Sequence, residues 1–524
     1  MASCDRAICI SFRLVCCFSV DVIVTDISAS YTHTHARTDD NLCSRTKVTC
    51  ISLFLRTSYL YTFFSDKMLR HASKRALRHA SVSGTKATSL TPMMSAHVVG
   101  QHGPAVAQPS AKCNARRSKH EEAKSRDPRC QHEWDKPFHA SPLPLDAAGG
   151  LLEYSVVYTD RSMNHMSKPF CDIMKNLNES LKEAYNAASV IIMPGSGTYG
   201  MEAVARQWCT GKKALVLRNG YFSYRWTDIF EQTNIPSETI VMRGQPVDPE
   251  NAQPHFAPAP IEEVVKTIKT EKPAVVFAPH VETSTGIILP DDYIKQVASA
   301  VHAHGGLFVL DCIASGHVWV DMKETGVDAI LSAPQKGWTG PACSSVIMLG
   351  ERGTHATRNT TSTSMVINMR KWLEVMDSYV NGGFAYYTTM PTDALSLFNG
   401  AANETKKIGF EKVKQMAWDL GMGTRKMMES KGLKSVAAPG FQAPGVVVSY
   451  TPEPNMFNIF KGKGMQIAAG VPFMINEPAG NFTFRIGLFG LDKVVNKDRT
   501  ISILEEKLDE ILPEIEKAEA EKTA

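Results

Sequence analysis

Long apolar runs are missing from this chain of 524 residues. No stretch of eighteen or more uninterrupted apolar residues occurs, which argues against a membrane-spanning helix. A strong charge of one sign is missing too. The formal net charge is only +4, so the composition does not suggest a nucleic-acid partner. With 43% hydrophobic and 21% charged residues, the chain has the composition of a soluble globular protein.

Cysteine is scarce in most of the chain, because eight of the twelve cysteines lie in the first 130 residues. The other four are Cys171, Cys209, Cys312 and Cys343. They share no metal-ligand spacing and have apolar neighbours. We therefore expect reduced, buried thiols and no metal site.

Sustained hydrophobic periodicity is absent from about the first 150 residues. Residues 1–67 contain two short apolar runs, Ala7–Val24 and Ile51–Phe64, and charged residues interrupt both. A signal anchor is one interpretation of the first run. The interpretation that we favour is an accessory or untranslated leader at the start of a disordered N-terminal extension.

Residues 68–145 form a basic segment that we expect to be largely disordered. Between Met68 and His120 there are nine Lys or Arg residues and no Asp or Glu. A helix that began at Met68 would place four apolar or small side chains on one face: Leu69, Ala72, Ala76 and Ala80. This composition is typical of a mitochondrial presequence with Met68 as the initiator, and it predicts a mitochondrial protein. A disordered basic tail on a cytoplasmic protein is the alternative.

From Leu151 onward, short apolar segments alternate with amphipathic helices such as Ile261–Lys269 and Asp292–His304. Near-continuous apolar strands separated by helices indicate an α/β fold, with a mostly parallel sheet covered on both faces. The segments expected to form strands are Val190–Met193, Ala214–Leu217, Thr239–Met242, Ala274–Phe277, Leu307–Leu310, Ala329–Ser332 and Ser344–Leu349.

We expect three parts in this folded region. Residues 151–190 form an N-terminal arm that joins the small lobe, residues 191–430 form the large domain, and residues 431–524 form a smaller C-terminal α+β domain. The last part contains two expected strands, Val446–Tyr450 and Phe482–Ile486, and a closing helix from Ser502 to about Lys517.

The segment from Met193 to Ala203, MPGSGTYGMEA, places a Gly-rich turn between a strand and a helix. Such a turn directs backbone N–H groups and the positive end of a helix at an anion. It also matches the dinucleotide pattern G-x-G-x-x-G, but that site needs an acidic residue about 20 positions further on, and none lies between Glu202 and Asp228. We therefore favour a loop that holds a monophosphate through Ser196, Gly197 and Thr198.

Two polar residues, Asp311 and Lys336, follow apolar strands. Each has a plain alternative: Asp311 as a helix cap or exposed strand end, and Lys336 as a solvated loop residue. They lie 25 positions apart with one helix-length connection between them, so both can reach the sheet edge where ligands of open α/β sheets bind. A lysine amine there can form an imine with an aldehyde. An acid can keep the pyridine nitrogen of pyridoxal 5′-phosphate (PLP) protonated.

Taken together, the motifs from Leu151 to Ile511 resemble class V aminotransferases of PLP fold type I, most closely the alanine–glyoxylate and serine–pyruvate group. The resemblance implies a large PLP-binding domain and a smaller C-terminal one. It rests on an ordered set of residues: Ser196-Gly-Thr198, Asn219-Gly-Tyr-Phe222, Glu282-Thr-Ser-Thr-Gly286, Asp311, Gln335-Lys336 and Arg485-Ile-Gly487.

The resemblance implies a role for each cofactor residue. Lys336 would form the Schiff base and move the proton between substrate and cofactor, and Asp311 would pair with the pyridinium nitrogen. Thr283 would bond near the ring hydroxyl, and Phe222 would stack on the ring. The phosphate would be held by Ser196, Gly197, Thr198 and Gln335.

Three further residues would act on the substrate and on a partner subunit. Arg485 would clamp the substrate carboxylate. Tyr386 and Thr389 match positions that reach the phosphate of the neighbouring subunit's cofactor, and this implies a homodimer.

The implied activity is a ping-pong transfer of an amino group from a small amino acid, of alanine or serine type, to an oxo acid, of glyoxylate or pyruvate type. Cysteine desulfurases share the fold, but they need a cysteine well after the lysine, and none follows Cys343. Another class V enzyme stays open as an alternative (a phosphonate-amine transaminase, a lyase or an epimerase), because the pocket steers PLP chemistry. A catalytically silent protein of this fold is less favoured.

The chain departs from the family at its start. The family usually opens with a Gly-Pro-Gly-Pro turn near the substrate, whereas this chain has LLEYSVVYTDRSMNHMS. Glu153, Tyr154 and Arg161 in this segment could present polar groups to a bulkier or charged substrate. Alternatively, they serve only in packing.

Overall fold

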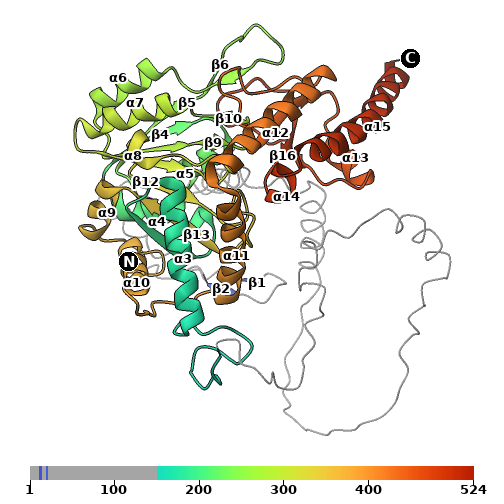
Figure 1. Ribbon diagram of the computed structural model, residues 1–524. Coiled ribbons are helices and arrows are strands. Elements are labelled where there is room, and N and C mark those ends of the chain that lie inside the picture. Colours follow the sequence, from blue (N-terminus) through green and yellow to red (C-terminus); the bar gives the residue numbers. More distant parts are fainter. Residues whose placement is uncertain (1–10, 14–18, 22–149, 524) are drawn as a thin grey trace, which may run out of the picture. The chain divides into compact units, whose positions relative to one another are not determined.

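The computed structural model describes residues 11–13, 19–21 and 150–523 (Figure 1). The first two ranges are the antiparallel strands β1 (Ser11–Arg13) and β2 (Ser19–Asp21). The basic segment and most of the leader lie outside the described residues. The fold below is that of residues 150–523.

Seven strands form the central sheet, in the order β3-β13-β12-β11-β8-β4-β5. All neighbours are parallel except β13, which is antiparallel to both β12 and β3. The expected mostly parallel sheet is confirmed. A loop without a helix joins β12 to β13, and so short a connection suits an antiparallel pair. The strands are β3 (Ser189–Pro194), β4 (Lys213–Arg218), β5 (Glu238–Arg243), β8 (Val275–Pro279), β11 (Leu307–Asp311), β12 (Ala329–Ser332) and β13 (Ser344–Leu349).

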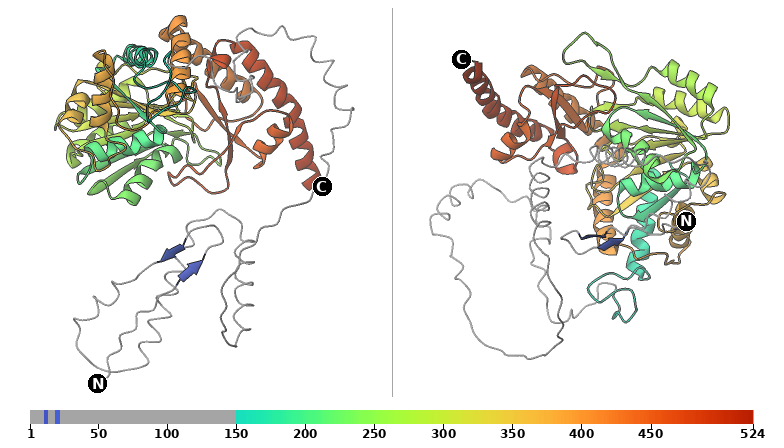
Figure 2. Two further views of the ribbon diagram at one scale, coloured as in Figure 1. Left: turned by 90° about the horizontal axis from the view of Figure 1, so that it is seen from below. Right: turned by 180° about the vertical axis from the view of Figure 1, so that it is seen from behind.

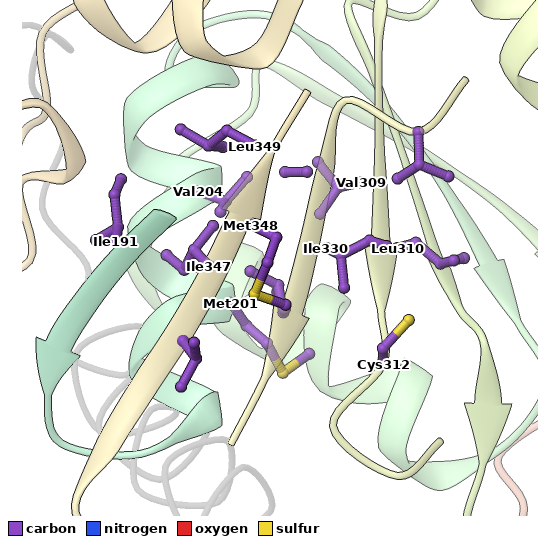
Figure 3. Packing of buried hydrophobic residues seen from close by; sticks show 14 of the residues in the cluster. Ile191, Met201, Val204, Val309, Leu310, Cys312, Ile330, Ile347, Met348 and Leu349 are labelled. Atoms are coloured by element: carbon purple, nitrogen blue, oxygen red, sulfur yellow. The ribbon is translucent and has the colours of Figure 1, made fainter. Parts of the chain in front are cut away.

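Helices cover both faces of this sheet. The strands β8, β11, β12 and β13 are therefore buried at nearly every position. Figure 3 shows Met201 and Val204 of one helix beside Ile347 of β13 in the resulting core. The helices around the sheet are α3 (Lys168–Tyr185), α4 (Gly197–Trp208), α5 (Tyr221–Thr233), α6 (Ile261–Glu271), α7 (Asp291–His302), α8 (Met322–Thr325), α9 (Glu351–Arg358), α10 (Met369–Val380) and α11 (Thr392–Ile408).

The N-terminal part of the described chain packs differently from the sequence-based expectation. Residues 151–190 were expected to join the small lobe. Instead, the buried face of α3, with Phe170, Met174 and Leu177, belongs to the core cluster of the large sheet and packs on β3, α10 and α11. An amphipathic helix shows which of its faces is buried, but not which lobe covers it.

The smaller C-terminal lobe has its own core and its own sheet (Figure 2, orange to red). Its three strands are antiparallel in the order β14-β16-β15, which agrees with the expected small α+β lobe. The lobe begins before the expected boundary at residue 431, because α12 packs in its core. Its elements are α12 (Phe410–Ser430), β14 (Val446–Thr451), α13 (Met456–Gly462), β15 (Ala468–Ala469), β16 (Phe482–Gly487), α14 (Leu491–Val494) and α15 (Lys497–Thr523).

Four short strands complete the fold: β6 (Gln245–Pro246), β7 (Phe256–Ala257), β9 (Val281–Glu282) and β10 (Ile287–Ile288). Among the described residues, no helix combines the length and the apolar character needed to cross a membrane.

Candidate active site

A cavity of about 400 Å³ lies at the carboxyl edge of the central sheet, against β14, β15 and β16 of the small lobe. Ligands of open α/β sheets bind at this edge. Nine residues that the sequence singles out line it together: Ser196, Gly197, Thr198, Phe222, Thr283, Asp311, Gln335, Lys336 and Arg485.

The turn before α4 forms one wall of the cavity. Ser196 is the N-cap of α4, but its side chain makes no capping hydrogen bond, and the first turn of the helix contains no acidic residue. A side chain at Gly197 would not fit, because a Cβ atom there would lie 2.3 Å from Cδ1 of Ile313. The helix N-terminus therefore faces the cavity as a cradle for an anion.

Arg225 also lines the cavity, and sequence reasoning missed it. Its Nη1 donates a hydrogen bond of 3.1 Å to Oγ1 of Thr198. Its guanidinium carbon lies 5.4 Å from the centroid of the Phe222 ring. Arg225 follows Phe222 by three positions on α5, so the two side chains share a helix face. That spacing was the available signal.

Asp311 is nearly fully buried at the end of β11. Burial raises the pKa of its carboxyl group to about 7, although a hydrogen bond of 2.9 Å from the backbone N–H of Ile313 acts in the opposite direction. A carboxylate in this place lacks a close cationic partner of its own among the described residues. The site therefore suits a ligand that brings a positive charge or a proton.

Lys336 lies in the turn between β12 and β13, with its Nζ 5.1 Å from the centroid of the Phe489 ring. Burial lowers the pKa of the amine, and the positive charge of Arg485 lowers it further. A larger neutral fraction makes the amine a better nucleophile. The turn is tightly packed, since a Cβ atom at Gly337 would lie 1.7 Å from the backbone oxygen of Gly316.

Glu282 is a second buried carboxylate, and sequence reasoning gave it no role. It is fully buried and accepts hydrogen bonds from the backbone N–H groups of Phe222 (3.1 Å) and Ser223 (2.9 Å) and from Oγ of Ser223 (2.7 Å). The carboxylate thereby holds the N-terminus of α5, which carries Phe222 and Arg225 into the cavity. The available signal was an acidic residue next to an apolar strand.

Arg485 enters the cavity from the small lobe, on β16. Its Nε donates a hydrogen bond of 2.8 Å to the carbonyl of Ala469, and its guanidinium carbon lies 5.6 Å from the centroid of the Phe222 ring. Among the described residues no partner holds its two terminal nitrogens. These nitrogens form the fork that binds a carboxylate through two parallel hydrogen bonds.

Two of the predicted site residues lie outside this cavity. Tyr386 and Thr389 are both exposed, and their side-chain oxygens lie 3.2 Å apart. The polar residues of the divergent opening do not line the cavity either. Glu153 accepts hydrogen bonds from the backbone N–H of Ser155 and from Nδ2 of Asn164, and Tyr154 is exposed.

This arrangement brings an amine, a buried acid and a guanidinium around one space beside an anion cradle. The sequence profile described as Aminotransferase class-V matches residues 145–443, more than half of the chain. This chain belongs to the class-V aminotransferase family. The resemblance inferred from the motifs is thereby confirmed, and the protein is a transferase of amino groups.

Relatives of this class-V aminotransferase are identical to it at about a quarter of the aligned positions. The L-aspartate–glyoxylate aminotransferase of Paracoccus denitrificans is 26% identical over 352 residues, which cover 63% of this chain and 84% of the relative. The serine–glyoxylate aminotransferase of Hyphomicrobium methylovorum is 27% identical over 334 residues, covering 61% and 77%. A crystal structure of an alanine–glyoxylate aminotransferase from Nostoc sp. has a TM-score of 0.56 at 20% identity, covering 71% of this chain and 98% of that one. This structural likeness supports the expected fold.

Class-V aminotransferases typically use PLP, and the cavity fits that group. The cradle at Ser196, Gly197 and Thr198 suits its phosphate, because backbone donors and a positive helix end converge there. The buried carboxyl group of Asp311 suits the ring nitrogen, and the amine of Lys336 suits the aldehyde.

Proposed function

We propose that this class-V aminotransferase binds PLP through Lys336 and exchanges amino groups between small amino acids and oxo acids. The donor would be of alanine or serine type and the acceptor of glyoxylate or pyruvate type, in a ping-pong reaction. The observation that carries the proposal is the convergence of Lys336, Asp311 and Arg485 on one cavity. The relatives named for glyoxylate support the choice of acceptor.

When bound, PLP supplies an aldehyde that condenses with amines and a ring that withdraws electrons from the substrate. Lys336 would bind that aldehyde and, once displaced by the substrate, would move the proton at the substrate Cα. Its lowered pKa favours the neutral amine that both tasks need. Asp311 would hold the proton on the ring nitrogen, because its burial makes a nearby positive charge favourable.

The remaining residues would position the cofactor. Phe222 would cover one face of the ring, held there by Arg225 and Arg485, whose guanidinium groups both lie near its own ring. Thr283 would bond near the ring hydroxyl. The phosphate would be held by Ser196, Gly197, Thr198 and Gln335.

Arg485 would bind the carboxylate that every amino acid and oxo acid presents. Donor and acceptor occupy the site in turn, so one guanidinium serves both half-reactions. The terminal nitrogens of Arg485, which no hydrogen bond holds among the described residues, favour substrates that present a carboxylate.

The test is a screen of purified protein, saturated with PLP, against single amino acids. Alanine, serine or a close analogue should convert the visible absorbance band of the lysine-bound cofactor to that of pyridoxamine phosphate. Glyoxylate or pyruvate should then restore the band. The Lys336→Ala variant is the control that should show no lysine-bound band. The proposal fails if only an aminophosphonate, or no amine, changes the spectrum.

We also propose that residues 68–145 direct the protein to mitochondria, because the stretch from Met68 to His120 is basic and free of acid, and its first part is amphipathic. A fluorescent fusion of Met68–Gln108 should accumulate in mitochondria of eukaryotic cells. A fusion in which Arg70, Lys74, Arg75 and Arg78 are replaced by Gln should not. A diffuse cytosolic signal from the unaltered fusion would reject this proposal.

A further inference from the structure

We infer that Arg218 and Arg243 form a second anion-binding site, which takes a phosphate or carboxylate group at the carboxyl ends of β4 and β5. Neither arginine lines the catalytic cavity. Each is the last residue of its strand, and the two are paired in register. Side chains of paired residues on neighbouring strands lie on the same face of a sheet. The two guanidinium groups are therefore neighbours.

No acid is paired with either positive charge among residues 150–523. Arg218 is 7% exposed, and neither arginine forms an ion pair with a carboxylate within the part of the chain that the structure describes. Burial lowers the pKa of Arg218, and the charge of Arg243 lowers it as well, whereas Tyr224 and then Glu231 act in the opposite direction. A buried cation beside a second cation is unfavourable unless an anion joins them.

Both arginines also have a buried N–H group without a partner. The terminal nitrogens of Arg218 donate hydrogen bonds to Oγ1 of Thr227 (2.6 Å) and, more weakly, to the carbonyl of Met474 (3.4 Å). The ring of Tyr224 covers the guanidinium, with 4.9 Å between its centroid and the Arg218 Cζ. The group is thus fixed, yet its Nε remains without a partner, as does Nε of Arg243.

An oxyanion between the two arginines would satisfy both features at once. Buried donors without partners are rare in folded proteins, and each is unfavourable by itself. Guanidinium groups match the geometry and charge of carboxylate and phosphate oxygens. Arg243 is only half-buried, so it leaves a route from solvent, while Arg218 forms the inner wall. The geometry therefore points to a small anion or to the anionic end of a larger molecule.

Arg218 of this second site contacts the segment that precedes β16, the strand that carries Arg485. Met474, whose carbonyl accepts from Arg218, lies between β15 and β16, and β16 carries Arg485. Met474 has a φ of 63°, which is unfavourable for a residue other than glycine. The contact with Arg218 thus ties this segment to the end of β4, beside the anion.

The experiment titrates the PLP-saturated protein with inorganic phosphate and, separately, with succinate, at constant ionic strength in an isothermal calorimeter. PLP occupies the catalytic cradle, so phosphate should report on the second site. We expect saturable binding of at least one anion. Succinate can also reach the carboxylate clamp at Arg485, so only the binding that Arg243→Gln weakens is assigned to the second site.

Arg243→Gln is the decisive variant, because Arg243 is half-buried and its replacement leaves Arg218 and its contacts in place. Loss of one charge-assisted hydrogen bond should weaken binding about tenfold or more. Arg206→Gln is the matched control, since Arg206 lies on α4 and is already paired with Glu202, and it should bind like the unaltered protein. Arg243→Lys should bind with intermediate affinity.

Two results would overturn the inference: no saturable binding of either anion by the unaltered protein, or equal binding by Arg243→Gln and Arg206→Gln. The visible PLP band of Arg243→Gln should be normal in every case. A protein without that band would contradict the proposed function, while the comparison of the two variants would still decide the anion site.

Discussion

Two ionisable groups with opposite pKa shifts face the same cavity. Burial raises the pKa of Asp311 and lowers the pKa of Lys336, so each group is pushed towards its neutral form in the absence of a ligand. A ligand with a protonated nitrogen would stabilise the ionised carboxylate of Asp311. A ligand with a carbonyl carbon would react with the neutral amine of Lys336. A pyridoxal ring offers both on one molecule, which is consistent with the cofactor that we propose for this cavity.

The pKa of Asp311 makes a prediction for the cofactor-free protein. The carboxyl group titrates at about 7 when folded and at 3.8 in the unfolded reference, so between these values the folded state holds the extra proton. Stability should therefore fall as pH rises from about 4 to about 7, with a slope of at most about 1.4 kcal/mol per pH unit from this group. Asp311→Asn removes the titrating group and this slope.

The measurement is the free energy of unfolding in urea, for the cofactor-free protein and for Asp311→Asn, across that pH range. Two buried histidines, His280 and His317, have pKa values lowered by burial to about 3 and about 4, so they change stability in the opposite direction. They are present in both proteins, and their effect cancels in the difference. A difference that does not change with pH would mean that Asp311 keeps an ordinary pKa.

Arg485 makes a prediction about specificity. Arg485→Lys replaces a two-pronged contact with a single one, and this should lower kcat/KM for amino acids by about ten- to a hundredfold, or roughly 1.5–3 kcal/mol. Both half-reactions should suffer, because donor and acceptor present the same group. PLP content and the turnover of amines without a carboxylate should be nearly unchanged. If amino-acid turnover is spared, Arg225, the other guanidinium in the cavity, becomes the candidate clamp.

At the scale of the elements, the N-terminus of α5 depends on Glu282. This buried carboxylate receives donors from Phe222, Ser223 and Ser284, so it fixes the start of the helix that positions Phe222 and Arg225. Glu282→Gln removes the negative charge. It also places an amide N–H₂ group, which is itself a donor, against the N–H donors that the carboxylate now accepts. We expect a loss of about 1.5–3 kcal/mol in the free energy of unfolding, together with weaker retention of PLP.

The matched control is Glu262→Gln, which changes an exposed acid in the first turn of α6. Its interaction with the helix dipole is worth about 0.3–1 kcal/mol, and it has no role in the cavity. Urea unfolding and dialysis of PLP measure both variants. Equal effects of the two changes would show that Glu282 contributes no more than an ordinary helix-end charge.

Element types were largely predictable from the sequence, whereas their partners were not. All seven strands of the sheet appear within two residues of the expected bounds, because buried strands are runs of apolar residues. A run of apolar residues does not indicate that β13 is antiparallel to its neighbours. The apolar face of α3 does not indicate the lobe on which the helix packs. Motifs located Lys336 and Asp311. Glu282 acts on Ser223 across 59 positions, and only the folded chain shows that contact.

At the scale of the whole molecule, the exposed positions of Tyr386 and Thr389 bear on whether the protein is a dimer. Both lie outside the cavity of their own chain, and Phe384 beside them is an apolar side chain that is 50% exposed. Such exposed apolar and aromatic side chains are typical of an interface. We therefore propose a homodimer in which each subunit supplies Tyr386 to the phosphate in the other subunit's cavity.

Mixing two inactive or weakened variants tests that proposal. Lys336→Ala keeps Tyr386 but cannot bind the cofactor covalently, and Tyr386→Ala keeps Lys336 but lacks the phosphate contact and should lose activity at limiting PLP. In a mixed dimer, the cavity of the Tyr386→Ala subunit contains Lys336 and receives Tyr386 from its partner, so one of the two sites is complete. Random reassociation of equal amounts makes about half of the dimers mixed, and activity should recover to about a quarter of that of the unaltered protein.

The same experiment distinguishes a contribution across subunits from one within a subunit. If Tyr386 acted in its own chain, each site of a mixed dimer would lack either Lys336 or Tyr386, and mixing would restore nothing. Light scattering must first show that each variant is dimeric, because a monomeric Tyr386→Ala would fail to complement for want of an interface. Lys336→Ala mixed with Arg485→Lys is the matched control. Arg485 lines the cavity of its own chain, so no mixed dimer contains a site with both Lys336 and Arg485, and activity should not rise.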